Sequence, residues 1–101
     1  MSGVNKVILV GNLGKDPELT YTANGTAKAA FSLAVGETFQ GANGREERTT
    51  WCNIVCWQKL AEVVATNLSK GRKVYVEGKL SISDYEDKAG QKRYITEIVA
   101  R

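Results

Sequence analysis

The chain has 101 residues, of which 43% are hydrophobic and 25% are charged, so it has room for one globular domain with one core. Its formal net charge of +3 permits a polyanionic partner without requiring one. No apolar run approaches the ~20 residues that cross a bilayer, and the N-terminus lacks the cationic start and apolar block of a signal peptide, so we expect a cytoplasmic protein.

The cysteine and histidine content excludes several kinds of chemistry. Cys52 and Cys56 are the only cysteines, and in one strand their Cα atoms would lie ~13 Å apart, beyond the ~7 Å limit for a disulfide. Two thiols without histidine also make a poor zinc site, so buried thiols acting as small hydrophobic groups are favoured. The absence of histidine removes the usual general base and the Ser-His or Cys-His nucleophiles. The sequence therefore predicts a protein that is not an enzyme and has no metal or cofactor.

The N-terminal half predicts the first strands. Residues 4–13 are apolar on both faces, which is typical of a strand covered on both sides, for example by another subunit. Residues 26–35 alternate between apolar and other residues, and this strand extends to Phe39 before a flexible hairpin tip at residues 40–44. Its predicted core face consists of Ala27, Ala29, Phe31, Leu33 and Val35.

A third strand, residues 51–57 (WCNIVCW), carries the most informative pattern. Side chains alternate between the two faces of a strand. One face receives Cys52, Ile54 and Cys56, and the other receives Trp51, Asn53, Val55 and Trp57. The two indoles would lie about 20 Å apart on the open face, which suits stacking on unpaired nucleobases. The alternative is that a partner subunit or a loop buries both of them.

The C-terminal half predicts one helix and two strands. Residues 58–69 have a helical apolar stripe, formed by Leu60, Val63, Val64, Asn67 and Leu68. Gly71 is expected to end this helix in a left-handed conformation. The core face of the next strand is expected to hold Val74, Val76, Leu80 and Ile82. Gly78 predicts a bend or bulge in that strand, and residues 88–90 form a turn before a last strand at residues 93–100.

The predicted order of elements is three strands, a helix and two strands. This order fits an all-β fold, a five-stranded OB barrel with one α-helix between strands 3 and 4. The open face and loops of such barrels bind oligonucleotides or oligosaccharides. Because no repeat or linker interrupts the chain, we expect residues 1–101 to form a single OB-fold domain.

Four segments resemble bacterial-type single-stranded DNA-binding proteins, and they follow one another in the order of that family. They are residues 4–18 (VNKVILVGNLGKDPE), 57–63 (WQKLAEV), 70–78 (KGRKVYVEG) and 90–97 (GQKRYITE). The resemblance implies an OB-fold homotetramer that wraps single-stranded DNA with little sequence preference. It also implies a role in DNA replication, recombination and repair in the bacterial cytoplasm, at the nucleoid, although an organellar origin stays open.

The resemblance further implies a set of base-stacking aromatic residues: Phe39, Trp51, Trp57 and Tyr85. Phe39 and Tyr85 stand where tryptophan is common in the family, so weaker stacking is expected there. Asp84 and Glu86 flank Tyr85 where the family often has a basic residue, which reduces the attraction for phosphate.

Lysine and arginine side chains are expected to neutralise the phosphates of the bound strand. The predicted phosphate contacts are Arg45, Lys59, Lys70, Arg72, Lys73 and Lys79. For each of them the alternative is an ordinary solvated surface charge.

The partners of the chain are less fully predicted. Tyr75 points away from the core, which indicates a subunit contact or, alternatively, a place on the DNA path. The family usually carries an acidic tail that recruits replication and repair enzymes, but this sequence ends at Arg101, so those partners are not expected from it. A second candidate function is an OB-fold replication-restart adaptor that acts mainly through protein contacts.

Overall fold

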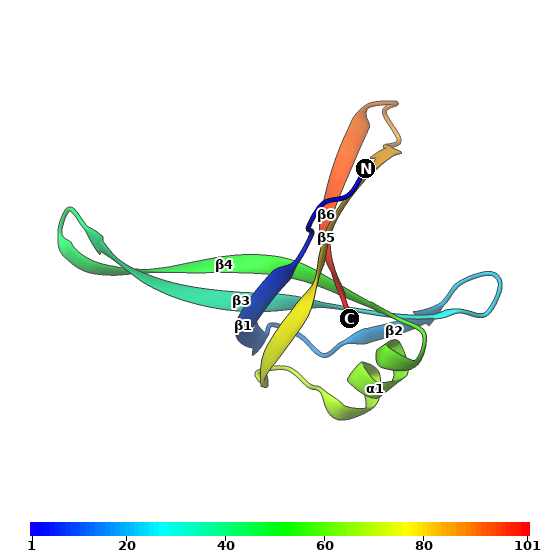
Figure 1. The fold of residues 1–101 in the computed structure, drawn as a ribbon, viewed down its shortest axis with the longest axis horizontal. Helices are drawn as coiled ribbons and strands as arrows, with labels where there is room; N and C mark the ends of the chain where they lie inside the picture. The colour runs from blue at the N-terminus through cyan, green and yellow to red at the C-terminus, as the bar shows by residue number, and fades with distance from the viewer.

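The computed structural model describes residues 1–101 and contains one sheet and one helix (Figure 1). The elements are β1 (Val7–Leu13), β2 (Glu18–Tyr21), β3 (Ala27–Gly41), β4 (Gly44–Trp57), α1 (Lys59–Asn67), β5 (Lys73–Glu86) and β6 (Lys92–Ala100). The strand order is β1-β5-β6-β4-β3-β2, and an additional pairing of β1 with β3 closes the five longer strands into a barrel. This architecture, with α1 after the third of these strands, confirms the predicted OB barrel. Since α1 has only nine residues, the structure contains no helix with the length and apolarity needed to cross a membrane.

The core confirms the alternation predicted for the central strands. Ala27, Ala29, Phe31 and Leu33 of β3 are buried, as are Ile54 and Cys56 of β4. They form one cluster with Leu13 of β1, Val76 of β5, Ile98 of β6 and two residues of α1. The predicted core face of β3 is therefore confirmed. The sequence could predict it because burial of one face determines which alternate residues of a strand point inward.

The helix packs on the barrel through a stripe that differs from the predicted one. Ala61 and Val64 are buried, whereas Val63 is 46% exposed and Asn67 is exposed. The side chain of Ala61 is small enough to let the helix approach the sheet closely, so Ala61 faces the barrel. A ranking of residues by hydrophobicity alone would have turned Val63 toward the barrel instead.

The helix also ends earlier than predicted. Its last residue is Asn67, and Leu68 is already extended, with φ −109° and ψ 149°. Gly71 has the left-handed conformation expected of it, with φ +88°. It lies in the loop after the helix, where its N–H donates to the Leu13 carbonyl at 2.8 Å. The prediction that Gly71 ends the helix was therefore wrong.

The first strand and β2 differ from the prediction as well. Residues 4–6 lie outside β1, and the side chain of Asn5 instead makes two hydrogen bonds to the backbone of Leu80, at 2.8 and 2.9 Å. The short strand β2 was not predicted. It pairs with β3 through Glu18↔Ala30 to Tyr21↔Ala27, and all four of its residues are exposed, so no buried face marks it in the sequence.

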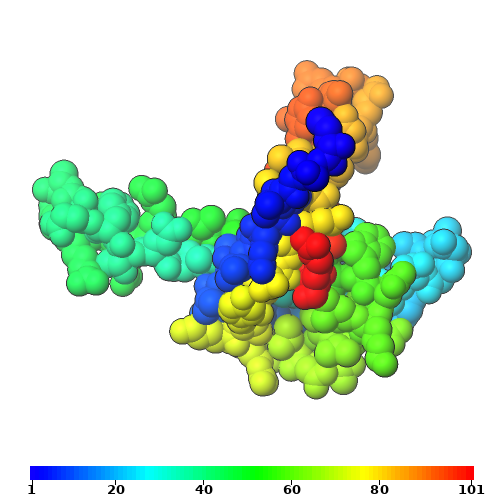
Figure 2. Space-filling view, viewed as in Figure 1, coloured from blue at the N-terminus to red at the C-terminus, as the bar shows by residue number.

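Two hairpins project from the barrel, and Figure 2 shows both as separate protrusions. We call residues 35–50 of β3 and β4 the ribbon, and residues 81–97 of β5 and β6 the arm. Leu80 and Ile82, which were predicted to be core residues, are 40% and 61% exposed. That prediction was wrong because β5 leaves the barrel at this point and pairs only with β6.

Two further residues of the sheet have surroundings that the sequence did not reveal. Val55 lies on the same side of β4 as Trp51 and Trp57, as predicted, but it is only 2% exposed, between Ala30 of β3 and Val99 of β6. Gly78 was expected at a bend or bulge. A Cβ at this position would collide with the carbonyl group of Val99, so glycine is required by the close approach of β6.

Candidate nucleic-acid interface

Trp51 and Trp57 lie on the outer face of β4, as the sequence predicted. Their side chains are 61% and 39% exposed. The β3–β4 ladder runs through fourteen consecutive pairs without a bulge. The side chains of β4 therefore alternate regularly between the two faces from the hairpin to the helix. The opposite face is apolar, and burial there raises the pKa of the Cys56 thiol to about 11. Both cysteines are free.

Trp51 is held against the loop that follows β1. A Cβ built on Gly14 would lie 2.6 Å from Cζ3 of the Trp51 ring and 2.9 Å from Oγ of Ser32. Only glycine therefore allows the indole to lie against this loop. The loop backbone is itself fixed, because the Gly14 N–H donates to the Ser32 carbonyl at 3.0 Å. The indole is thus positioned before any ligand arrives.

A row of paired residues connects Trp51 with a lysine on β5. Trp51 pairs with Ala34, Ala34 with Asn12, and Asn12 with Lys73. Directly paired residues share one face of a sheet, and strands lie about 4.8 Å apart, so the Lys73 backbone lies about 14 Å from that of Trp51. The structure therefore places Lys73 on the same face as the exposed indole.

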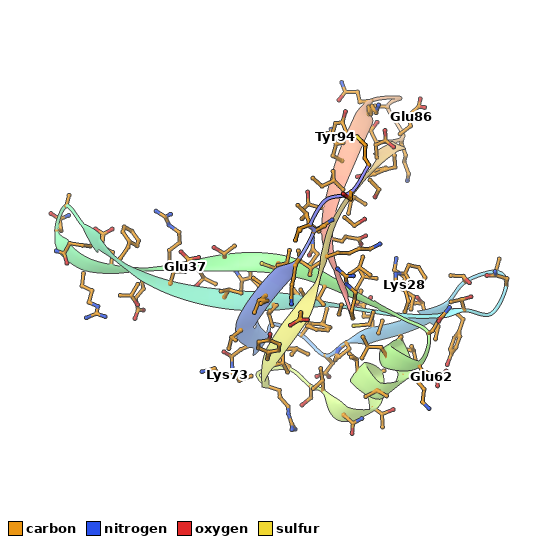
Figure 3. All side chains as sticks on the ribbon, in the orientation of Figure 1. Lys28, Glu37, Glu62, Lys73, Glu86 and Tyr94 are labelled. Atoms are coloured by element: carbon orange, nitrogen blue, oxygen red, sulfur yellow. The ribbon has the colours of Figure 1, made fainter.

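A second row places cations beside Trp57. Trp57 pairs with Lys28, and Lys28 pairs with Thr20 of β2. The Lys28 Nζ lies 5.4 Å from the centroid of the indole ring, within the range of a cation–π interaction. Lys59 begins α1 two residues after Trp57. In Figure 3, Lys28 and Lys73 lie on opposite sides of the barrel.

Four predicted phosphate contacts remain, and like Lys59 and Lys73 they are exposed. Lys70 and Arg72 lie in the loop between α1 and β5. This loop is tied to the end of β1 by the bond from the Gly71 N–H to the Leu13 carbonyl, and to the loop after β1 by the bond from the Lys70 N–H to Asp16 Oδ1 at 2.7 Å. Lys79 shares the outer face through the row Val55, Val99 and Lys79. Arg45 lies next to the tip of the ribbon. The three ion pairs of the protein use Lys6, Lys92 and Arg93 instead, so the six predicted cations keep their charges free.

Phe39 and Tyr85 lie away from the two tryptophans. Phe39 is 37% exposed and pairs with Glu46 in the ribbon. By the alternation of the ladder, Phe39 and Glu46 lie on the face opposite to that of Trp51. Two-stranded ribbons twist strongly, and this twist reorients their faces along the length. Tyr85 pairs with Arg93 in the arm and is 49% exposed. The structure therefore gathers two of the four predicted aromatic residues on the barrel and places one on each projecting hairpin.

The surroundings of Tyr85 contain cations that are already paired. Lys92 forms an ion pair with Asp84 at 3.1 Å, and Arg93 with Asp87 at 2.8 Å. The Arg93 guanidinium, together with the backbone N–H groups of Gln91 and Ala89, lowers the pKa of Asp87. These pairs leave little free positive charge near Tyr85, which agrees with the weaker attraction for phosphate expected from the sequence.

Sequence reasoning missed the neighbours that reach these aromatic residues from other strands. Tyr94 of β6, which is 67% exposed, lines a groove of about 360 Å³ together with Trp51, Asn53 and Ile95. Arg48 lies over the ring of Phe39. Both contacts depend on strand pairing, which no local sequence signal gives. No group of three or more His, Cys, Asp or Glu side chains is placed to hold a metal ion.

Another exposed surface lies on the outer face of β1 and β5. Ile8, Val10 and Tyr75 are 54%, 47% and 61% exposed, and Val10 pairs directly with Tyr75. The Tyr75 hydroxyl donates to Glu77 at 2.9 Å, and this bond lowers the pKa of Glu77 and raises that of Tyr75. We call Ile8, Val10 and Tyr75 the apolar patch.

Comparisons with known proteins agree with this geometry. Residues 4–101 match the single-strand binding protein family. The chain is 48% identical over 99 residues to "Single-stranded DNA-binding protein 1" of Chlorobaculum tepidum, covering 96% of this chain and 61% of that protein. It also resembles a solved structure described as "Plasmodium falciparum SSB complex with ssDNA", with a TM-score of 0.91, 33% identity, and coverage of 99% of this chain and 88% of that one. The chain belongs to the single-strand binding protein family.

Proposed function

We propose that this protein binds single-stranded DNA without sequence preference and without catalysis. The observation that carries the proposal is the pair of exposed indoles, Trp51 and Trp57, on the outer face of the barrel, in a chain that belongs to the single-strand binding protein family. Each has a lysine on its own row of paired residues, Lys73 for Trp51 and Lys28 for Trp57. Stacking and charge neutralisation are the two interactions that an unpaired strand requires.

The stacking component comes from the aromatic residues. Every base has a π-face, so stacking contributes about 1–3 kcal/mol per base with little dependence on sequence. Trp51 is the best-positioned platform because its ring lies against Gly14, whose N–H is bonded to the Ser32 carbonyl. Trp57 would take a second base, while Phe39 and Tyr85 would extend the path onto the ribbon and the arm.

The electrostatic component comes from the unpaired lysines and arginines. Each phosphate that a cation neutralises releases counterions, so affinity falls as the salt concentration rises. The proposed contacts are Arg45, Lys59, Lys70, Arg72, Lys73 and Lys79, with Lys28 added because of its place over Trp57. Duplex DNA would bind poorly because its bases are already stacked on one another.

We further propose that the protein assembles as a homotetramer. The apolar patch and the exposed Leu80 and Ile82 are surfaces that a second copy of the chain can bury. Its proposed role is protection of single strands during DNA replication, recombination and repair, in the bacterial cytoplasm at the nucleoid.

A binding assay with a fluorescently labelled oligothymidylate tests the function, with unlabelled duplex of equal length as competitor. We expect tight binding that the duplex does not displace and that weakens with salt. Weak binding together with a dimeric mass would contradict the proposal and favour the adaptor function.

A further inference from the structure

On the ribbon, an arginine covers the ring of Phe39. The guanidinium carbon of Arg48 lies 4.7 Å from the centroid of the Phe39 ring. Phe39 pairs with Glu46, so Arg48 is its diagonal neighbour, two residues further along β4 on the same face of the ladder. This contact leaves Phe39 only 37% exposed, compared with 61% for Trp51.

Arg48 makes no other polar contact. Glu37 pairs with it directly across the ladder, yet no ion pair or hydrogen bond of the protein involves the Arg48 side chain. The ring of Phe39, rather than the carboxylate of Glu37, therefore orients the guanidinium. All five of its N–H donors are free, and a planar guanidinium that contacts the ring on one side still has a second face for a ligand.

We infer that Arg48 and Phe39 act together as one composite platform for single-stranded DNA. A base stacks on the open face of the guanidinium, which rests on the phenyl ring, while the N–H groups bind an adjoining phosphate. Arginine is suited to both tasks because its cation is planar, delocalised and weakly hydrated. This inference rests on the proposed function and adds a residue to it.

The substitution Arg48→Lys separates the platform from a simple charge contact, because lysine keeps the charge but has no plane on which a base can stack. We expect Arg48→Lys to bind oligothymidylate about three- to tenfold more weakly at an unchanged salt slope. Arg48→Ala should bind more weakly still, with the salt slope reduced by ~0.7 for the loss of one phosphate contact. Arg101→Lys makes the same exchange away from the ribbon, at a guanidinium that donates to the Asn5 carbonyl at 2.9 Å, and serves as the matched control.

A double-mutant cycle with Phe39→Ala tests whether the two residues act as one unit. If they do, the double variant, which carries both Phe39→Ala and Arg48→Ala, loses little more affinity for the strand than the weaker-binding of the two single variants. All variants should melt at the temperature of the parent, because both side chains lie on the projecting ribbon.

The inference is overturned if Arg48→Lys binds like the parent, or if the cycle is additive, since Arg48 is then only a charge. It is also overturned if Arg48→Ala binds more tightly, because Arg48 would then shield Phe39 from bases. These outcomes presuppose that the parent binds oligothymidylate. Absence of binding by the parent would instead overturn the proposed function.

Discussion

At the scale of single residues, the placement of Trp51 depends on the absence of a side chain at Gly14. Gly14→Ala would put a methyl group 2.6 Å from the indole, so the ring must move. We expect a loss of about 1–3 kcal/mol in the free energy of unfolding, as for other overpacked sites, together with weaker binding of single-stranded DNA. Urea unfolding and a binding titration measure the two effects.

Gly36→Ala is the matched control for Gly14→Ala. A Cβ at Gly36 has no neighbour within 4 Å, and this glycine is in the same strand that supports Trp51. We expect Gly36→Ala to bind like the parent. If Gly14→Ala behaves in the same way, the indole is not positioned by this loop.

The two cysteines should differ in reactivity. Cys56 is 1% exposed and burial raises its pKa to about 11, whereas Cys52 is partly exposed. In the folded protein near neutral pH, iodoacetamide should modify Cys52 first, because the thiolate is the reactive form. Both cysteines lie in one tryptic peptide, residues 49–59, so fragment-ion mass spectrometry of that peptide measures the order. Equal rates at the two thiols would contradict the burial of Cys56.

The raised pKa of Cys56 also has a consequence for stability. Because this pKa is higher in the folded state, the folded protein retains a proton that the unfolded chain releases. The contribution of the thiol to stability is therefore complete below pH 9.0, the ordinary pKa of a cysteine in the unfolded chain, and is lost as the pH rises from there through about 11. Cys56→Ser should reduce this alkaline loss of stability, which thermal melts across that pH range can measure.

At the scale of elements, the helix shows what a sequence pattern can and cannot determine. The periodicity of residues 58–69 predicted the helix, but its inward stripe includes Ala61 and leaves Val63 exposed. Apolarity alone ranks valine above alanine, whereas the short distance between helix and barrel requires the smaller side chain. The strand β2 shows the converse case, since pairing with β3 forms it without any buried residue.

Substitutions on α1 test this assignment. Ala61→Leu should lower the free energy of unfolding by about 1–3 kcal/mol, because the added methylene groups have no space against the barrel. Val63→Ala, on the outer side of the same helix, should change it by less than about 0.5 kcal/mol. Denaturant unfolding measures both, and a larger loss in Val63→Ala than in Ala61→Leu would reverse the orientation of the helix.

The strands show the same division between what the sequence predicts and what it leaves open. Alternation in residues 51–57 predicted the outward tryptophans and the inward cysteines, because one buried face fixes the whole strand. The contacts of Lys28 with Trp57 and of Arg48 with Phe39 could not be predicted, since both cross from one strand to another. The same holds for Leu80 and Ile82, whose pattern is that of a core strand although the arm leaves the barrel.

At the scale of the whole molecule, the apolar patch is expected to form a contact between subunits. Val10→Glu would place a carboxylate among Ile8 and Tyr75, so we expect a smaller assembly. Light scattering during size-exclusion chromatography measures the mass. Leu19→Glu, on the exposed strand β2, is the control and should leave the mass of the parent unchanged. A parent protein with the mass of a single chain would contradict the proposed tetramer.

The central claim is that Trp51 and Trp57 stack on unpaired bases, and tryptophan fluorescence tests it most directly. Trp57→Phe and Trp51→Phe each leave one indole, and each variant is titrated with poly-thymidine at several salt concentrations. We predict saturable quenching of both single indoles, with a midpoint that shifts to higher DNA concentration as salt increases. Unchanged fluorescence at low salt would contradict the account, whether or not the protein binds the strand. It would indicate that the indoles serve protein contacts.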